Sequence, residues 1–184
     1  MRFKPSLKAS LLLSGILTMT GCSTLSLTNL FGSDKLAADA NWVLVPVANF
    51  SPSSDADEQV ERMVTVLTPA IGLKNLNRPP DPEIASETGL LDDASRIQAA
   101  KEWANQQDFQ YSLTGKVLSW TDADADINQP AMISLTLEVY DLKSNELLWT
   151  ISGSSEGMRG QSVYEITRPL ISSLLVSLPL NTNE

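Results

Sequence analysis

The segment Met132-Ile-Ser-Leu-Thr-Leu-Glu-Val-Tyr-Asp141 alternates apolar and polar side chains almost without interruption. In an extended strand, successive side chains point to opposite faces, so this pattern predicts a half-buried strand. The predicted buried side carries Ile133, Leu135, Leu137 and Val139, and the opposite side carries Ser134, Thr136 and Glu138. A tight turn at Lys143-Ser144-Asn145 and a second apolar run, Glu146–Ser152, complete a predicted hairpin.

The hairpin is preceded and followed by further periodic segments. Upstream, Trp42–Val47 is typical of a buried strand that Pro46 must interrupt or confine to an edge. Tyr111–Trp120 is predicted as a further alternating strand, and a short strand is predicted near Leu73–Leu76. Three helices are expected from their apolar stripes. The first carries Val60, Met63, Val64, Leu67 and Ile71, and the second carries Ile97, Ala100, Trp103 and Ala104 after a cap at Asp92 or Asp93. The last carries Val163, Ile166, Leu170, Leu174 and Leu178, and Pro169 is expected to kink or restart it.

These segments predict one α/β (α+β) domain over residues 41–184, with a mixed β-sheet flanked by helices. The expected order of elements is β-α-(β)-α-β-β-β-α. We find no internal repeat and no sign of a second domain in the sequence.

The beginning of the chain has the pattern of a secretory leader. Arg2, Lys4 and Lys8 precede an apolar run that ends in Gly21 and the chain's single cysteine, Cys22. This arrangement resembles a bacterial lipobox, with Met19 in place of the usual leucine. We therefore expect a signal peptide at 1–21, diacylglycerol and an N-acyl chain on Cys22, and a lipidated tether at 22–40. An ordinary secretory signal that happens to contain a cysteine is the alternative.

The charge of the chain excludes some partners. Without the three basic residues of the leader, the formal charge falls from −9 to −12. Nucleic-acid binding needs basic patches, so we expect no nucleic acid as a partner. An acidic surface suits a cationic partner, although it also simply keeps proteins soluble. Ser23 after the lipidated cysteine is not the aspartate that retains lipoproteins in the inner membrane, so we expect the inner leaflet of the outer membrane, facing the periplasm.

The sequence contains little that suggests catalysis. It has no histidine, which removes the usual general base and the imidazole metal ligand. Gly153-Ser-Ser-Glu-Gly157 matches the pattern of a nucleophile elbow, but without a base we expect only a flexible loop. Asp122, Asp124 and Asp126 open like a calcium loop but lack the glycine and glutamate that would complete one. We expect no enzyme activity, no catalytic residue, no metal and no cofactor other than the lipid.

Two features remain as candidate sites. Asp122, Asp124 and Asp126 lie between two predicted strands, and copies meeting around an axis would gather these carboxylates on one rim. A solvated loop is the simpler alternative. We also predict Trp149 as a contact to the membrane or to a neighbouring subunit, with a place in the core as its alternative.

The mature chain resembles the PelC family, the outer-membrane lipoproteins of Pel exopolysaccharide export. The matching features follow in order, from Trp42-Val-Leu-Val-Pro-Val-Ala-Asn49 and Gln59-Val-Glu61 through Ala100-x-x-Trp103-Ala104, Tyr111-x-Leu-Thr-Gly115-x-Val117-x-x-Trp120, Val139-x-Asp141 and Glu146-Leu-Leu-Trp149 to Leu174-Leu175-x-x-Leu178-Pro179. A weaker resemblance links the chain to the curli exporter and the cell-wall synthase activators.

The PelC resemblance implies a homo-oligomeric ring, a dodecamer, beneath an outer-membrane β-barrel exporter. Its acidic funnel would guide a cationic, partly deacetylated amino-sugar polymer outward. We assign Asp122, Asp124 and Asp126 to that funnel because they cluster, and not by transfer from the family. The alternative function is a monomeric lipoprotein that regulates a peptidoglycan synthase.

Overall fold

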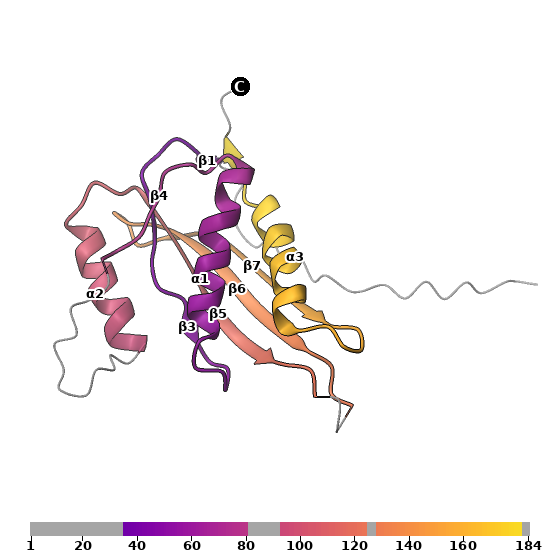
Figure 1. Cartoon of the computed structure of the whole chain (residues 1–184). Helices are drawn as coiled ribbons and strands as arrows, with labels where there is room; N and C mark the ends of the chain where they lie inside the picture. Colours follow the sequence, from indigo (N-terminus) through magenta and orange to yellow (C-terminus); the bar gives the residue numbers. More distant parts are fainter. Residues whose placement is uncertain (1–34, 81–92, 125–127, 182–184) are drawn as a thin grey trace, which may run out of the picture.

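The computed structural model describes residues 35–80, 93–124 and 128–181. Figure 1 shows a mixed sheet with helices packed on it, as the sequence predicts. The sheet order is β4-β2-β5-β6-β7, and β3 also pairs with β5. The strands are β2 (Trp42–Leu44), β3 (Ala48–Asn49), β4 (Leu76–Asn77), β5 (Tyr111–Thr121), β6 (Met132–Asp141) and β7 (Leu147–Glu156). The helices are α1 (Ala56–Leu67), which continues into a 3-10 turn η1 (Thr68–Ile71), α2 (Asp93–Asn105) and α3 (Val163–Val176).

The predicted hairpin of β6 and β7 is confirmed and forms one side of the sheet, with β7 at its edge. β6 pairs antiparallel with both β5 and β7, and Val139 lies opposite Leu113 on one side and Trp149 on the other. The predicted inner side of β6 is buried, with Ile133, Leu135, Leu137 and Val139 at most 1% exposed. β2 joins β5 in parallel, which requires the crossover that contains α1, β4 and α2.

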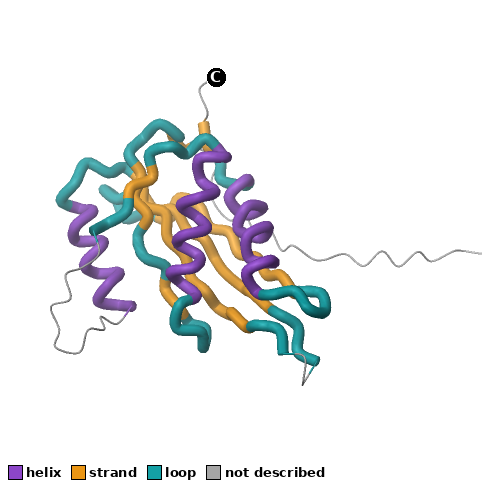
Figure 2. Tube along the Cα trace, viewed as in Figure 1, coloured by secondary structure: helices purple, strands orange, loops and turns teal. Residues whose placement is uncertain are grey.

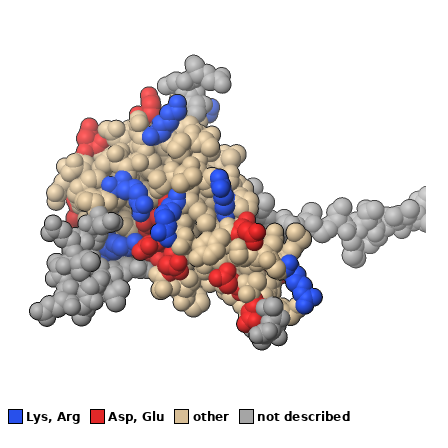
Figure 3. All heavy atoms as spheres, in the orientation of Figure 1, with Lys and Arg blue, Asp and Glu red and all other residues tan. Residues whose placement is uncertain are grey.

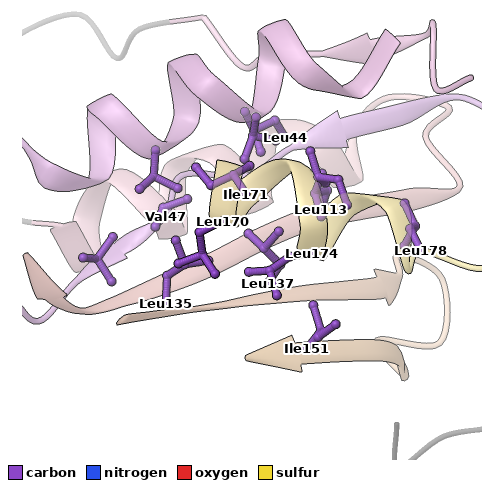
Figure 4. Packing of buried hydrophobic residues seen from close by; sticks show 14 of the residues in the cluster. Leu44, Val47, Leu113, Leu135, Leu137, Ile151, Leu170, Ile171, Leu174 and Leu178 are labelled. Atoms are coloured by element: carbon purple, nitrogen blue, oxygen red, sulfur yellow. The ribbon is translucent and has the colours of Figure 1, made fainter. Parts of the chain in front are cut away.

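Helices cover the two faces of the sheet unequally. α1 and α3 pack on the inner face, where Leu170, Ile171 and Leu174 contact the apolar side of β6 and β7 (Figure 4). α2 packs on the other face at β2, where Ala100 and Ala104 form a small cluster with Val43 and Val45. The fold is therefore a single mixed α/β domain, in agreement with the predicted class.

Two predicted strands have different limits in the structure. The run Trp42–Val47 is split at Pro46, which lies between β2 and β3 because it has no N–H to donate to a ladder. β7 extends to Glu156, so Gly153–Glu156 are strand residues, and the prediction of a flexible loop there was wrong. Gly153 suits the strand because an added Cβ would lie 3.0 Å from Leu170 and Leu174.

The last helix is not interrupted at its proline. α3 runs from Val163 to Val176 with Pro169 inside it, so the predicted restart of the helix at this residue was wrong. Pro169 lies on the exposed side of the helix. Glu165, whose carbonyl receives no N–H from Pro169, is also exposed, so water can replace the missing donor.

A second, two-stranded sheet closes the domain. β1 (Leu36–Ala37) pairs in parallel with β8 (Leu180–Asn181), and Leu36 is buried in the main core. Residues 35–40, which the sequence analysis placed in the tether, therefore belong to the folded domain. They were missed because two residues are too few to show a strand period. In the described part of the chain, no helix has the length and apolarity required to cross a bilayer.

Candidate functional site

Three loops meet at one end of the domain, which we call the acidic end. They are residues 50–55 before α1, the described residues 122–124 and 128–131 between β5 and β6, and residues 157–162 before α3. Figure 2 shows these loops together at the end opposite to β1 and β8. They meet there because β5 and β7 run toward this end while α1, β6 and α3 all begin at it. On the face drawn in Figure 3, acidic side chains gather toward this end and basic ones lie mainly above them.

Asp122, the first residue of the β5–β6 loop, connects this loop to α3. Its Oδ1 accepts a hydrogen bond from the backbone N–H of Val163 at 3.2 Å, in the first turn of the helix. Ser162 caps the same helix in a capping box with Glu165, whose pKa is lowered chiefly by the hydrogen bond from the Ser162 backbone. Carboxylates at this position are favoured by the unpaired N–H groups of the helix start. Asp122 therefore has a structural contact as well as an exposed carboxylate.

The predicted acidic run shares a groove with residues from other loops. Asp124 and Gln129 exchange backbone hydrogen bonds of 2.9 and 2.8 Å, which closes the base of the loop. Asp122 and Asp124 line a groove of about 600 Å³ together with Glu156 and Arg159. Asp126 lies outside the described residues. The described groove thus holds three carboxylates and one guanidinium.

Glu156 was not predicted as a member of this site. It comes from the end of β7, where the β6–β7 register places it opposite Met132. The register of β7 and its length of ten residues, against the seven predicted, bring Glu156 there. The local sequence does not show either of them.

The acidic end also exposes large apolar side chains. Five of the seven most exposed large apolar residues in the described chain lie at or near these loops: Phe50, Leu118, Met132, Met158 and Tyr164. Tyr164 packs edge-on against Trp120 with ring centroids 5.4 Å apart. The surface at this end therefore combines carboxylates with exposed apolar and aromatic side chains.

A second charged cluster lies between α1 and the segments next to it, and sequence reasoning missed it. Asp57 and Glu61, one turn apart on α1, are 4% and 3% exposed. Arg96 of α2 pairs with both carboxylates, at 3.3 Å to Glu61, and Arg78 lies 2.9 Å from Glu61. The backbone N–H of Val47 donates to Glu61 Oε1 at 2.9 Å. The cluster therefore joins α1, α2 and the break between β2 and β3.

The environment of Glu61 opposes its ionisation. Burial raises the pKa of this carboxyl, and the hydrogen bond from Val47 and the charges of Arg96 and Arg78 offset that effect only in part. A cavity of about 700 Å³ opens beside the cluster, with Trp103 and Pro46 among its walls. Because every charge in the cluster has a partner, we interpret it as a structural contact that holds α2 on the domain.

The other predicted sites have different outcomes. Trp149 is 3% exposed and belongs to the main core, which was its alternative role, so it is not placed to contact a membrane or a neighbouring subunit. Cys22 lies outside the described residues. Within residues 35–80, 93–124 and 128–181, no group of acidic residues or cysteines is arranged to hold a metal ion.

Comparison with known proteins places the fold. No family profile matches the sequence, and no curated protein matches it. Among solved structures, the PelC dodecamer from Paraburkholderia phytofirmans matches with a TM-score of 0.67 and 20% identity, covering 85% of this chain and 99% of that chain. A variant of the same dodecamer gives 0.66 and 21%, with 84% and 98% covered. Lipoprotein GNA1162 from Neisseria meningitidis gives 0.50 and 18%, with 74% and 94% covered.

These matches define a class of single-domain α/β proteins that includes bacterial lipoproteins. Within that class, the chain has the PelC fold over most of its length, and the fold implied by the sequence resemblance is confirmed.

Proposed function

We propose that this chain is a PelC-type lipoprotein of exopolysaccharide export. In this proposal Cys22 carries the lipid in the inner leaflet of the outer membrane, and copies form a ring next to a β-barrel exporter. The acidic end lines a funnel that guides a cationic amino-sugar polymer to that exporter. The fold supports the proposal, since the PelC structures of the same fold are dodecamers.

The observation that carries the proposal is the position of the carboxylates. Asp122 and Asp124 come from the β5–β6 loop and Glu156 from the end of β7, yet all three line one groove at one end of the domain. A ring of subunits in the same orientation would repeat this end around its axis. Stacked charge of one sign in a confined space concentrates the opposite charge, which suits an amine-bearing polymer.

The chain direction gives the proposed funnel an orientation. The described domain begins at Lys35 beside β1, at the end opposite to the acidic loops. Only twelve residues lie between Cys22 and Lys35, whereas the eleven residues of β5 alone span about 35 Å. A lipid on Cys22 therefore holds the β1 end near the membrane and leaves the acidic end facing the periplasm, where the polymer arrives.

The proposal includes no reaction. The proteins with similar folds named above are lipoproteins and PelC assemblies. The serine that lines the groove, Ser162, shares its hydroxyl with Glu165 in the capping box of α3, so we assign it to the fold. The groove is suited to weak, repeated contact with a moving polymer, because its carboxylates are exposed and screened by water.

The native mass of the acylated protein in detergent tests the proposal. We expect one closed species of many subunits by native mass spectrometry or light scattering. A monomer at membrane-like concentrations would overturn the ring and its funnel, and would favour the alternative of a monomeric regulator of a peptidoglycan synthase.

A further inference from the structure

The outer face of β5, β6 and β7 carries an ordered array of short polar side chains. The strand registers align it in three cross-strand rows, each with one residue per strand. Row by row, the residues are Ser119, Ser134 and Ser154; Lys116, Thr136 and Ser152; and Thr114, Glu138 and Thr150. We call these nine residues the hydroxyl face. Seven of its nine positions are serine or threonine, so the face is flat and loses little side-chain entropy when it is covered.

The hydroxyl face carries no net charge. Its single cation and single anion are paired, with Lys116 Nζ 2.6 Å from Glu138 Oε1. Tyr140 donates to the second Glu138 oxygen at 3.0 Å. The chain as a whole carries −9, so two copies repel each other except where their surfaces are neutral. This face is such a surface.

Three of the seven hydroxyl groups of the face have hydrogen-bond partners within the domain. Thr136 and Ser152 share a hydrogen bond of 2.8 Å, and Thr114 donates to the carbonyl of Pro46 at 3.0 Å. Both Glu138 oxygens are also bonded, so the charged groups of the face keep their partners when it is covered. Burial of a polar group is costly mainly when its hydrogen bonds are lost, so the covering surface must itself offer polar groups to the remaining hydroxyls.

The face continues to an unprotected strand edge. β7 is the last strand of the sheet, and Leu147–Ser155 contain no charged residue and no proline. Exposed edges usually carry lysine, proline or another device that prevents pairing with a second chain. Ser152 and Ser154 of β7 are exposed, whereas the described helices α1 and α3 lie on the inner face and α2 lies over β2. Thus none of the described helices covers the outer side of β7.

We propose that the hydroxyl face and the adjoining β7 edge form one side of the contact with a second copy of this chain, which in a closed ring meets it through a different surface. The inference rests on the proposed ring and assigns the surface through which neighbours meet. The nine residues cover about 14 Å by 17 Å, roughly a third of what one partner buries in a standard interface. The β7 edge extends that area. A cationic polymer is a poorer occupant, because the face is neutral and the carboxylates lie elsewhere.

A charge-insertion pair tests the surface in the full-length acylated protein. The double variant Ser152→Glu/Ser154→Glu adds two charges at exposed positions of the face. We expect it to stay folded by circular dichroism and to need at least a tenfold higher concentration to reach the wild-type native mass. The control Gln106→Glu/Gln107→Glu adds the same charge at exposed positions after α2 and should assemble normally. An assembled face variant, or a control that dissociates equally, would overturn the inference.

Thiol protection gives a second measurement that does not disturb the face. With Cys22 acylated, Ser154→Cys and the control Gln107→Cys each carry one free thiol. In the native oligomer we expect maleimide to modify Cys at position 107 at least tenfold faster, and the two rates to converge after dissociation. Equal rates in the intact oligomer would show that the face is exposed and would exclude the proposed contact. A wild-type protein that is monomeric would instead overturn the proposed function itself.

Discussion

The carboxylate of Asp122 and the backbone N–H of Val163 are joined by a hydrogen bond of 3.2 Å, which fastens the β5–β6 loop to the start of α3. Asp122 therefore has two roles. Its acceptor oxygen stabilises the fold, and its negative charge remains available to a ligand.

The two roles of Asp122 make opposite demands on its substitutions. We expect Asp122→Ala to lower the free energy of unfolding by about 1 kcal/mol, because a donor at the helix start loses its partner. Asp122→Asn keeps an acceptor oxygen and should cost less than half as much. Urea denaturation of both variants checks this, and equal losses would show that the charge, and not the acceptor, stabilises the loop.

The asparagine substitutions allow the proposed funnel to be tested without unfolding the protein. We expect Asp122→Asn/Asp124→Asn/Asp126→Asn to weaken binding of a soluble, partly deacetylated glucosamine oligomer at least tenfold. Wild-type binding should weaken in the same direction with added salt, because the contacts are between exposed charges.

The matched control removes three acidic charges elsewhere. Glu102→Gln/Asp108→Asn/Glu146→Gln alters exposed residues away from the acidic end and should bind the oligomer nearly as wild type does. If the two triple variants bind alike, net charge alone attracts the polymer. If the aspartate variant binds and exports as wild type does, the assignment of these residues to a funnel is wrong.

Trp149 should behave as a core residue. Its indole is almost completely buried, so we expect Trp149→Ala to lower the free energy of unfolding by about 3–5 kcal/mol through the cavity it leaves. Its Nε1 is buried without a hydrogen-bond partner, so Trp149→Phe removes an unsatisfied donor and should be clearly milder. Thermal denaturation compares the two. A stable Trp149→Ala protein that releases from vesicles would restore the membrane contact.

The stability of the domain should depend on the ionisation of Glu61. Burial raises the pKa of this group above its ordinary value of 4.5, so the folded state holds the proton more tightly than the unfolded state. The favourable contribution is complete at low pH and is lost as the pH rises through the folded pKa. We therefore expect wild-type stability to fall relative to Glu61→Gln as the pH rises above about 4.5.

Equilibrium urea unfolding across the range from pH 4 to neutrality measures this difference. The glutamine keeps an acceptor for the N–H of Val47, so the comparison isolates the charge. A difference between the two proteins that does not change with pH would show that Arg78 and Arg96 fully compensate the burial of Glu61.

Local periodicity was enough to predict the centre of the fold. The buried side of β6, the hairpin to β7 and the apolar stripe of α1 follow from backbone geometry over a few residues, and each is present in the structure. Prediction was less successful where a distant segment determines the outcome. Gly153–Glu156 form a strand because β6 offers them partners, and α3 passes through Pro169 because its buried side is held by the sheet.

The sequence by itself determined the class of the fold, the acidic character of the protein and the expectation of a lipid on Cys22, because these follow from composition and short-range pattern. Only the tertiary structure brought Glu156 to Asp122, paired Glu61 with Arg78 and Arg96, and enclosed Trp149. Those relationships depend on strand register and on crossovers that join residues far apart in the chain. The neighbours of a side chain depend on where its helix or strand packs, whereas the local sequence indicates only which face of that helix or strand is buried.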